Sequence, residues 1–190
     1  NSVTDGYGGI LYTIRNTLKL RMENNTFIDN YSKGGTGAFH FEWVEFLDLA
    51  ITNNTFIVSN YSTVFPTQDW IHFISCKGEG RIDNLQVFIE GDLSLQMISV
   101  VISPSFFLSM NNVTVYQKSP ISVPADGVSR GKHFSLINSN SGEFNLSNLN
   151  ISNAILSKEP IINLKCANKT NKVSLSSSTF SNITQRGPSV

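Results

Sequence analysis

The feature of this chain that most limits its fold is a sequence repeat with a period of about thirty residues. The segment MENNTFIDNYS at 22–32 recurs almost unchanged as ITNNTFIVSNYS at 51–62. Weaker copies follow as IDNLQV (82–87), MNNVTV (110–115), LSNLNI (146–151) and LSSSTF (175–180). Such a period is typical of proteins whose repeats stack on one another, because one repeat alone cannot bury its apolar face. The copies therefore predict a stacked repeat fold over the whole chain.

Apolar and polar residues alternate along each copy. The apolar residue that opens a copy, here called its anchor, is Met22, Ile51, Ile82, Met110, Leu146 or Leu175. Further apolar residues stand two positions before five of the six anchors, four positions before three of them, and five positions after each one. A separate apolar stretch, such as WIHFIS at 70–75, precedes this alternation. A period of two indicates β-strands with one buried face, so each repeat is expected to form three short strands.

Three strands in each repeat of about 30 residues predict one triangular coil. We therefore expect an all-β fold, a single-stranded right-handed parallel β-helix of about six coils, with residues 1–190 as one domain. A helical solenoid would show apolar stripes with a period of 3.6, and a leucine-rich repeat would show its dense leucine consensus. Neither pattern is found in the sequence.

An asparagine stands two residues after five of the six anchors, at Asn24, Asn53, Asn84, Asn112 and Asn148. If the parity of the preceding strand continues, these side chains point into the helix at a corner. Stacked amides there can donate hydrogen bonds to one another and also satisfy the backbone of the turn. The alternative is that asparagine simply favours turns. The common register favours an inward asparagine ladder.

The first two coils resemble a known family of surface proteins. GGILY (8–12) and GGTGAFHF (34–41) flank FIDN (27–30). This order resembles the GGA(I/L/V) and FxxN repeats of the chlamydial polymorphic membrane proteins and related adhesin-type β-helices. The later coils match those motifs less well. The resemblance implies a pectin-lyase-like β-helix at the cell surface, with an adhesive or structural role.

Nine Asn-x-Ser/Thr sequons suggest either a glycosylated protein of a eukaryotic secretory route or selection for Asn and Ser in turns. Those at Asn24, Asn53 and Asn112 belong to the expected inward ladder and are discounted on that ground. The candidate N-glycosylation sites are Asn145, Asn168, Asn30, Asn60, Asn182 and Asn150. Three of them, Asn30, Asn60 and Asn182, are predicted to share one corner, where a structural FxxN turn is the competing interpretation.

Charge and hydropathy argue against nucleic acid binding and against a membrane-spanning helix. Fourteen basic residues balance fourteen acidic ones without a cluster, so the field that gathers nucleic acid is missing. The most apolar stretch, Met97 to Met110, is interrupted by serines and a proline and is shorter than the roughly 20 residues of a membrane-spanning helix. We expect neither a nucleic acid partner nor a membrane-spanning segment.

The two cysteines, Cys76 and Cys166, fall in the third and sixth coils. Three coil spacings separate them by roughly 14 Å, and a disulfide needs Cα atoms within about 7 Å. They are not expected to pair with each other, and neither has neighbours at a metal-ligand spacing.

Catalysis is not expected, although β-helices also include polysaccharide lyases and glycosidases. Those enzymes resemble one another in using clustered carboxylates, and glycoside cleavage needs an acid paired with a base or nucleophile. The best cleft that the sequence offers combines Asp69, His72 and Glu42. His40 and His72 are expected to stack beside Tyr12 as half-exposed strand residues. The alternative is a pH-sensing or substrate-contacting histidine pair. We predict no catalytic, cofactor-binding or metal-binding residues, and no cofactor.

The predicted role is a structural or adhesive module of a secreted or cell-surface protein, such as a building block of an extracellular filament. The alternative is a β-helix that binds or cleaves polysaccharide. The insertion at 117–132 is either a recognition loop or a tolerated surface excursion. Asn1, Asn30 and Asn182 share one repeat phase, and neither end shows a capping element. We therefore expect a segment of a longer rod that associates with itself or with other β-helical segments, or binds cell-surface glycans or proteins.

Overall fold

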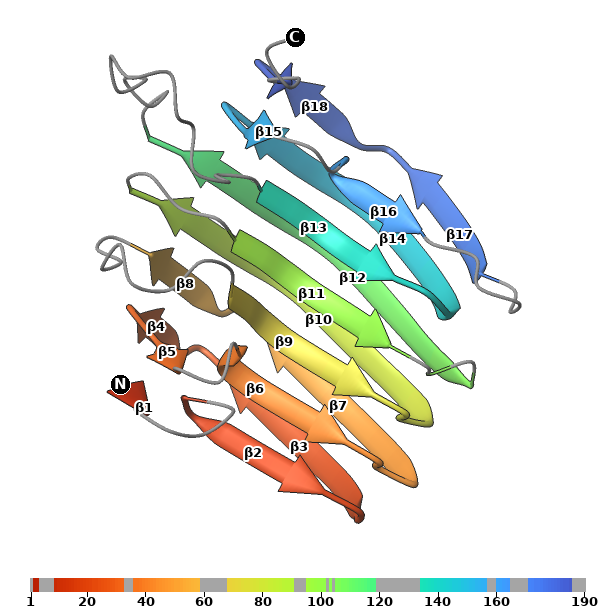
Figure 1. Cartoon of the computed structure of the whole chain (residues 1–190). Coiled ribbons are helices and arrows are strands. Elements are labelled where there is room, and N and C mark those ends of the chain that lie inside the picture. The colour runs from red at the N-terminus through yellow and green to blue at the C-terminus, as the bar shows by residue number, and fades with distance from the viewer. Residues whose placement is uncertain are drawn as a thin grey trace, which may run out of the picture.

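In the computed structural model the chain is a parallel β-helix (Figure 1). The structure describes residues 2–3, 9–32, 36–58, 68–90, 95–101, 103, 105–118, 134–156, 160–164 and 171–185. Every regular element in these ranges is a β-strand, and every strand pairing is parallel. Parallel neighbours separated by about thirty residues are the pattern that the repeat predicts. The all-β fold class is confirmed.

Two long sheets run the length of the stack. The first sheet contains β2 (Leu11–Ile14), β6 (Thr36–Glu42), β9 (Gln68–Ile74), β11 (Leu95–Val101), β13 (Phe134–Ser139) and β16 (Ile162–Leu164). The second sheet contains β3 (Thr17–Glu23), β7 (Phe46–Thr52), β10 (Gly78–Ile89), β12 (Phe106–Gln117), β14 (Gly142–Ser152) and β17 (Asn171–Ser176), joined by β4 (Thr26–Ile28), β8 (Thr55–Val58) and β18 (Thr179–Ser181). Two short pairs complete the set, β1 (Ser2–Val3) with β5 (Tyr31–Ser32) and β15 (Ile155–Leu156) with β19 (Thr184–Gln185).

The coils differ from the prediction in two details. Only four strands of the first sheet, β6, β9, β11 and β13, have a neighbour on both sides, so the stack has about four enclosed turns between two terminal coils. The predicted third strand is separate in the outer coils, as β4, β8 and β18. In the central coils it is the continuation of the second strand through a bend, which makes β10, β12 and β14 eleven or twelve residues long.

The register of the second sheet places apolar side chains of successive coils on top of one another inside the helix. The anchors form one row, in which Ile51, Ile82, Met110 and Leu146 are all completely buried. Aromatic side chains stack in the same way, and the rings of Phe27 and Phe56 lie 4.7 Å apart. Burial of such rows stabilises the fold by roughly 1.5–3 kcal/mol for each large apolar side chain.

The asparagine ladder lies outside the helix, so its predicted inward orientation is wrong. Asn24, Asn53, Asn84, Asn112 and Asn148 are all exposed, and each has a φ between 51° and 56°. A residue in this left-handed conformation bends the strand and breaks its alternation, so the residue after it points inward instead. Asparagine tolerates this conformation better than most residues do.

The inward position at this bend is one residue later than predicted, and Asn54 occupies it with 1% of its surface exposed. Its Oδ1 accepts a hydrogen bond from the backbone N–H of Asn25 at 2.9 Å. Its Nδ2 donates to the carbonyls of Met22 and Thr52, both at 2.9 Å. The buried amide therefore satisfies the corner backbone of two coils.

Candidate functional site

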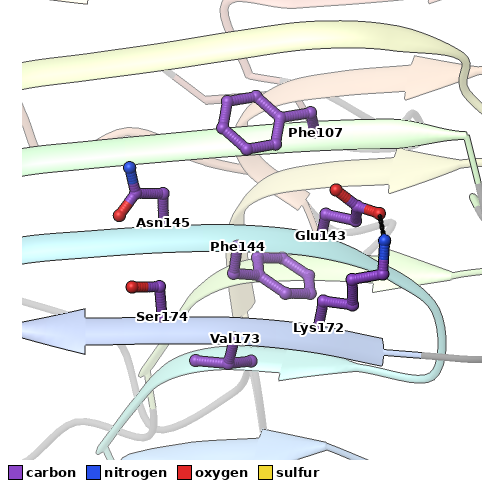
Figure 2. Close-up of a pocket in the computed structure, with 7 residues that line it drawn as sticks. All are labelled: Phe107, Glu143, Phe144, Asn145, Lys172, Val173 and Ser174. Carbon is purple, nitrogen blue, oxygen red and sulfur yellow. Dashed lines mark hydrogen bonds and ion pairs between the residues drawn. The ribbon is translucent and has the colours of Figure 1, made fainter.

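A shallow groove crosses the outer face of the second sheet at β12, β14 and β17 (Figure 2). Its volume is 330 Å³. The groove is lined by Phe107, Glu143, Phe144, Asn145, Lys172, Val173 and Ser174. Neither the groove nor the set of residues that forms it was among the sequence-based site predictions.

Strand parity and register bring the groove's outward side chains together. Phe107, Glu143 and Lys172 are directly opposite one another on β12, β14 and β17. Asn145 and Ser174 form the next outward row, two residues further along their strands. Side chains of adjacent parallel strands lie about 4.8 Å apart, so these five groups face one patch of solvent. Phe107, Glu143 and Lys172 each stand three residues before the anchor of their repeat. An alignment of the repeats at this position would have predicted that they lie side by side.

The charges in the groove compensate each other. Lys172 Nζ donates to Glu143 Oε1 at 2.6 Å, and the two side chains are 70% and 45% exposed. An exposed pair of this kind stabilises the fold by at most about 1 kcal/mol. Because the pair is neutral, the groove offers hydrogen-bond donors and acceptors without a net charge that would attract an ionic ligand.

The uncharged groups in the groove suit a ligand with apolar and polar faces. Phe107 exposes 39% of its surface and presents the only aromatic ring among the exposed side chains of the groove. Asn145 is exposed beside it and contributes an amide that can both donate and accept. Ser174 adds a hydroxyl group. An aromatic face beside neutral hydrogen-bonding groups matches the C–H faces and hydroxyl edges of a sugar ring.

The second candidate site is a row of aromatic side chains on the first sheet. Tyr12, His40 and His72 are in register on β2, β6 and β9, as predicted, with ring centroids 5.1 Å apart at both steps. Half-exposure was expected for both histidines; His72 is partly exposed, but His40 exposes only 2% of its surface. Glu42 lies beside this row. It accepts hydrogen bonds from the Tyr12 hydroxyl at 3.2 Å and from Trp43 Nε1 at 3.0 Å.

Burial makes both histidines poor bases. It lowers the pKa of His72 to about 4, and the neighbouring His40 lowers it further, while Glu42 acts in the opposite direction. Burial also lowers the pKa of His40, against the attraction of Glu42, whose Oε2 lies 3.5 Å from its Nε2. Both imidazoles are therefore neutral near pH 7, which does not suit a pH sensor in that range. The side chain of Asp69, the third member of the cleft predicted with His72 and Glu42, lies outside the described residues.

The structure separates the sequons by exposure. Asn145, Asn150 and Asn182 are exposed. Asn30 is a wrong candidate, because its side chain is 4% exposed and leaves no room for a sugar. It also does not share a corner position with Asn182, which is in register with Asp29. Asn60 and Asn168 lie outside the described residues.

Three sequons that were discounted because of the expected inward ladder, Asn24, Asn53 and Asn112, are exposed. The reason for discounting them was therefore wrong. Of the predicted insertion 117–132, only Gln117 and Lys118 are described, and Lys118 pairs with Glu90 at 3.2 Å.

Cys76 is buried with a free thiol. Burial raises the pKa of this thiol to about 11, although hydrogen bonds to backbone groups of Val44 and Ile74 act in the opposite direction. A protonated, buried thiol is a weak nucleophile, so Cys76 functions as a small apolar core residue. Cys166 lies outside the described residues.

Comparison with protein-family models, with curated proteins and with solved structures finds no match. Within the described ranges, His, Cys, Asp and Glu form no cluster of three or more that could hold a metal ion. Nor does any described helix reach the length and apolarity needed to cross a membrane.

Proposed function

We propose that this chain is a structural and adhesive module of an extracellular or cell-surface protein, and that it stacks end to end with other copies. The observation that supports this role is the exposed apolar edge of the last coil. Val173 and Leu175 are 39% and 48% exposed, whereas Phe144 and Leu146, directly opposite them on β14, are 2% and 0% exposed. Phe180 on β18 is likewise 39% exposed.

The described strands at the two edges of the second sheet each have a partner on one side only. Among the described strands, β17 pairs only with β14, and β3 at the other end of Figure 1 pairs only with β7. An unpaired strand edge with apolar side chains is a template for another strand. A further β-helical coil would cover it with both hydrogen bonds and apolar contacts.

The first coil of a second copy supplies such a layer in register. Continuing the rows of the second sheet places Leu20 on Val173 and Met22 on Leu175. It also places Phe27 on Phe180, as Phe27 already stacks on Phe56. A head-to-tail contact of this kind does not close on itself, so its repetition gives a filament.

The surface location is supported by two sequence features. The first is the resemblance of GGILY, FIDN and GGTGAFHF to the motifs of the chlamydial polymorphic membrane proteins. The second is the set of nine sequons, several of which are exposed. Both fit a secreted rod that acts through its surface and its ends.

Sedimentation velocity over micromolar concentrations tests the proposed stacking. We expect concentration-dependent oligomers for the parent chain and a monomer for Leu175→Asp, because a carboxylate cannot be buried in an apolar contact. Asn145→Asp, an outward substitution on the neighbouring strand, is the matched control and should still associate. A parent chain that remains monomeric throughout would contradict the proposal.

A polysaccharide-binding or polysaccharide-cleaving β-helix is the second candidate, favoured by the groove at Phe107. Incubation with a panel of neutral and acidic polysaccharides distinguishes these roles. A structural module releases no product from any of them. Product release that Asp69→Asn abolishes would support the enzyme instead.

A further inference from the structure

Asn145 combines a sequon with a place in the groove. Its sequon, Asn145-Leu146-Ser147, lies in β14 between two neighbouring strands. Leu146 points inward and is completely buried, so Asn145 points outward, where it is exposed. The strand thus fixes both the direction and the surroundings of whatever is attached to this side chain.

The amide nitrogen of Asn145 differs from those of two other exposed sequons, Asn112 and Asn182. In Asn112 the Nδ2 donates to Asn84 Oδ1 at 2.7 Å, and in Asn182 it donates to Asn153 Oδ1 at 3.0 Å. A sugar on either nitrogen would replace one of its two hydrogens and crowd this contact between coils. Among the described residues, no hydrogen bond engages the Asn145 side chain, so its Nδ2 can carry a substituent without disturbing such a contact.

Phe107 supplies a surface for that substituent. It stands on the adjacent strand, opposite Glu143 and diagonal to Asn145. In Figure 2 the ring extends toward the side of the groove where Asn145 lies. Diagonal neighbours on adjacent strands are within reach of aromatic side chains. A pyranose on Asn145 can therefore lay its C–H face on the ring and cover apolar surface that is now exposed.

The polar groups of the groove fit a neutral sugar. The Lys172–Glu143 pair compensates its own charge, so an anionic sugar gains no net attraction. Ser174, directly opposite Asn145 on β17, is placed to hydrogen-bond a hydroxyl or acetamido group. A neutral N-acetylated hexose meets these requirements.

We propose that Asn145 carries an N-linked glycan and that the first sugar of this glycan lies in the groove, packed on Phe107. This inference rests on the proposed extracellular role. In the attachment step a bond forms between Nδ2 and the anomeric carbon of a lipid-diphosphate-linked oligosaccharide. The bond from that carbon to the diphosphate breaks, the diphosphate leaves, and Nδ2 loses one proton.

Attachment takes place before the strand folds. In the folded chain Ser147 Oγ is already hydrogen-bonded to Asn111 Oδ1 at 3.1 Å, and β14 is paired along both edges. The folded structure is compatible with a glycan at some sequons and incompatible with one at others. It accommodates a sugar at Asn145 and excludes one at the buried Asn30.

The experiment uses the full chain secreted from a eukaryotic host that glycosylates sequons. Peptide mass spectrometry measures the occupancy of each sequon, and NMR measures the chemical shifts of the sugar protons at Asn145. We expect Asn145 to be occupied and its first sugar to show upfield ring-current shifts. These shifts should disappear in Phe107→Leu and persist in Phe46→Leu, a matched exposed phenylalanine on the same sheet.

The outcomes separate this inference from the proposed function. Occupancy at Asn150 or Asn182 with an empty Asn145 overturns the inference and leaves the secretory role standing. An occupied Asn145 without ring-current shifts overturns the packing on Phe107 in the same way. Occupancy of no sequon in the folded, secreted chain overturns the inference as well, while end-to-end stacking is measured independently by sedimentation of the unglycosylated chain.

Discussion

Asn84 donates a hydrogen bond from its Nδ2 to Asn53 Oδ1 in the preceding coil, at 2.8 Å. Asn112 repeats the contact one coil later by donating to Asn84 Oδ1 at 2.7 Å. Asn148 breaks the series, because it donates to Asn111 instead of Asn112. The three residues Asn53, Asn84 and Asn112 thus form an external amide ladder at a bend where each backbone has a positive φ.

The first prediction concerns the bend at Asn84. Asn84→Ala should lower the free energy of unfolding by about 1–2 kcal/mol, because alanine tolerates the left-handed conformation poorly. Asn84→Gly keeps the conformation accessible and loses only the exposed hydrogen bonds, so its effect should be smaller. Urea denaturation of both variants measures the difference. If the glycine variant were the less stable of the two, the backbone explanation would be wrong.

The second prediction concerns the buried amide at the same bend. Asn54→Leu should destabilise the chain by about 1–3 kcal/mol, because the N–H of Asn25 and the carbonyls of Met22 and Thr52 lose their partner. Leucine itself fits this row, since Leu85 and Leu149 occupy it in later coils. Thermal unfolding provides the measurement, with Leu149→Ile as a control for packing. Unchanged stability of Asn54→Leu would show that water replaces the amide at little cost.

A third prediction follows from the close approach of two coils at Gly78. Its φ is 110°, and a Cβ there would lie 2.2 Å from the carbonyl oxygen of Leu47. Gly78→Ala should therefore cost about 2 kcal/mol or more. At Gly80 the nearest atom to an added Cβ is the flexible Leu108 side chain at 3.0 Å, so Gly80→Ala should cost less. Equal denaturation midpoints for the two variants would contradict this reasoning.

The fourth prediction is a loss of stability in acid. The folded pKa of His72 is lowered to about 4, whereas an unfolded histidine titrates near 6.5. Between these values only the unfolded chain binds the proton, so stability should fall as pH decreases from about 6.5 toward 4. His72→Gln should reduce this slope. Part of the slope should remain in the variant, in the same direction, because the pKa of His40 is also lowered. A slope of unfolding free energy against pH that is identical in parent and variant would rule out His72 as its source.

The sequence predicts the stacking of the coils well because the signal is local and repeated. Each anchor lies in a stretch of alternating residues, and Ile51, Ile82 and Met110 align in the structure as they do in the repeat. The same reasoning fails at the bend, because it assumes that strand parity continues through Asn84. One left-handed residue shifts the inward position to the next residue, which is Leu85 in that coil and Asn54 in the coil before.

The groove could not be predicted from any single repeat of the sequence. Phe107, Glu143 and Lys172 belong to three different coils, and none of them differs from an ordinary outward strand residue in its own repeat. Only the register between coils brings them together. The burial of His40 was also missed, because outward strand positions were expected to stay at least half-exposed.

The stacking of copies is tested most directly by cysteine cross-linking. In a head-to-tail stack, Arg21 of one copy lies in the same outward row as Ser174 of the next. Adjacent strands place their Cα atoms about 4.8 Å apart, within disulfide range. Within one chain these residues are five strand spacings apart, roughly 24 Å, so any disulfide between them joins two copies.

A chain carrying Arg21→Cys and Ser174→Cys in a Cys166→Ser background is oxidised at micromolar concentration and analysed by non-reducing electrophoresis and peptide mapping. The account predicts a ladder of covalent oligomers joined through positions 21 and 174. Arg21→Cys with Ser176→Cys, which shifts the second thiol by two residues out of register, should cross-link far less. Purely monomeric chains, or equal cross-linking of both pairs, would contradict end-to-end stacking in register.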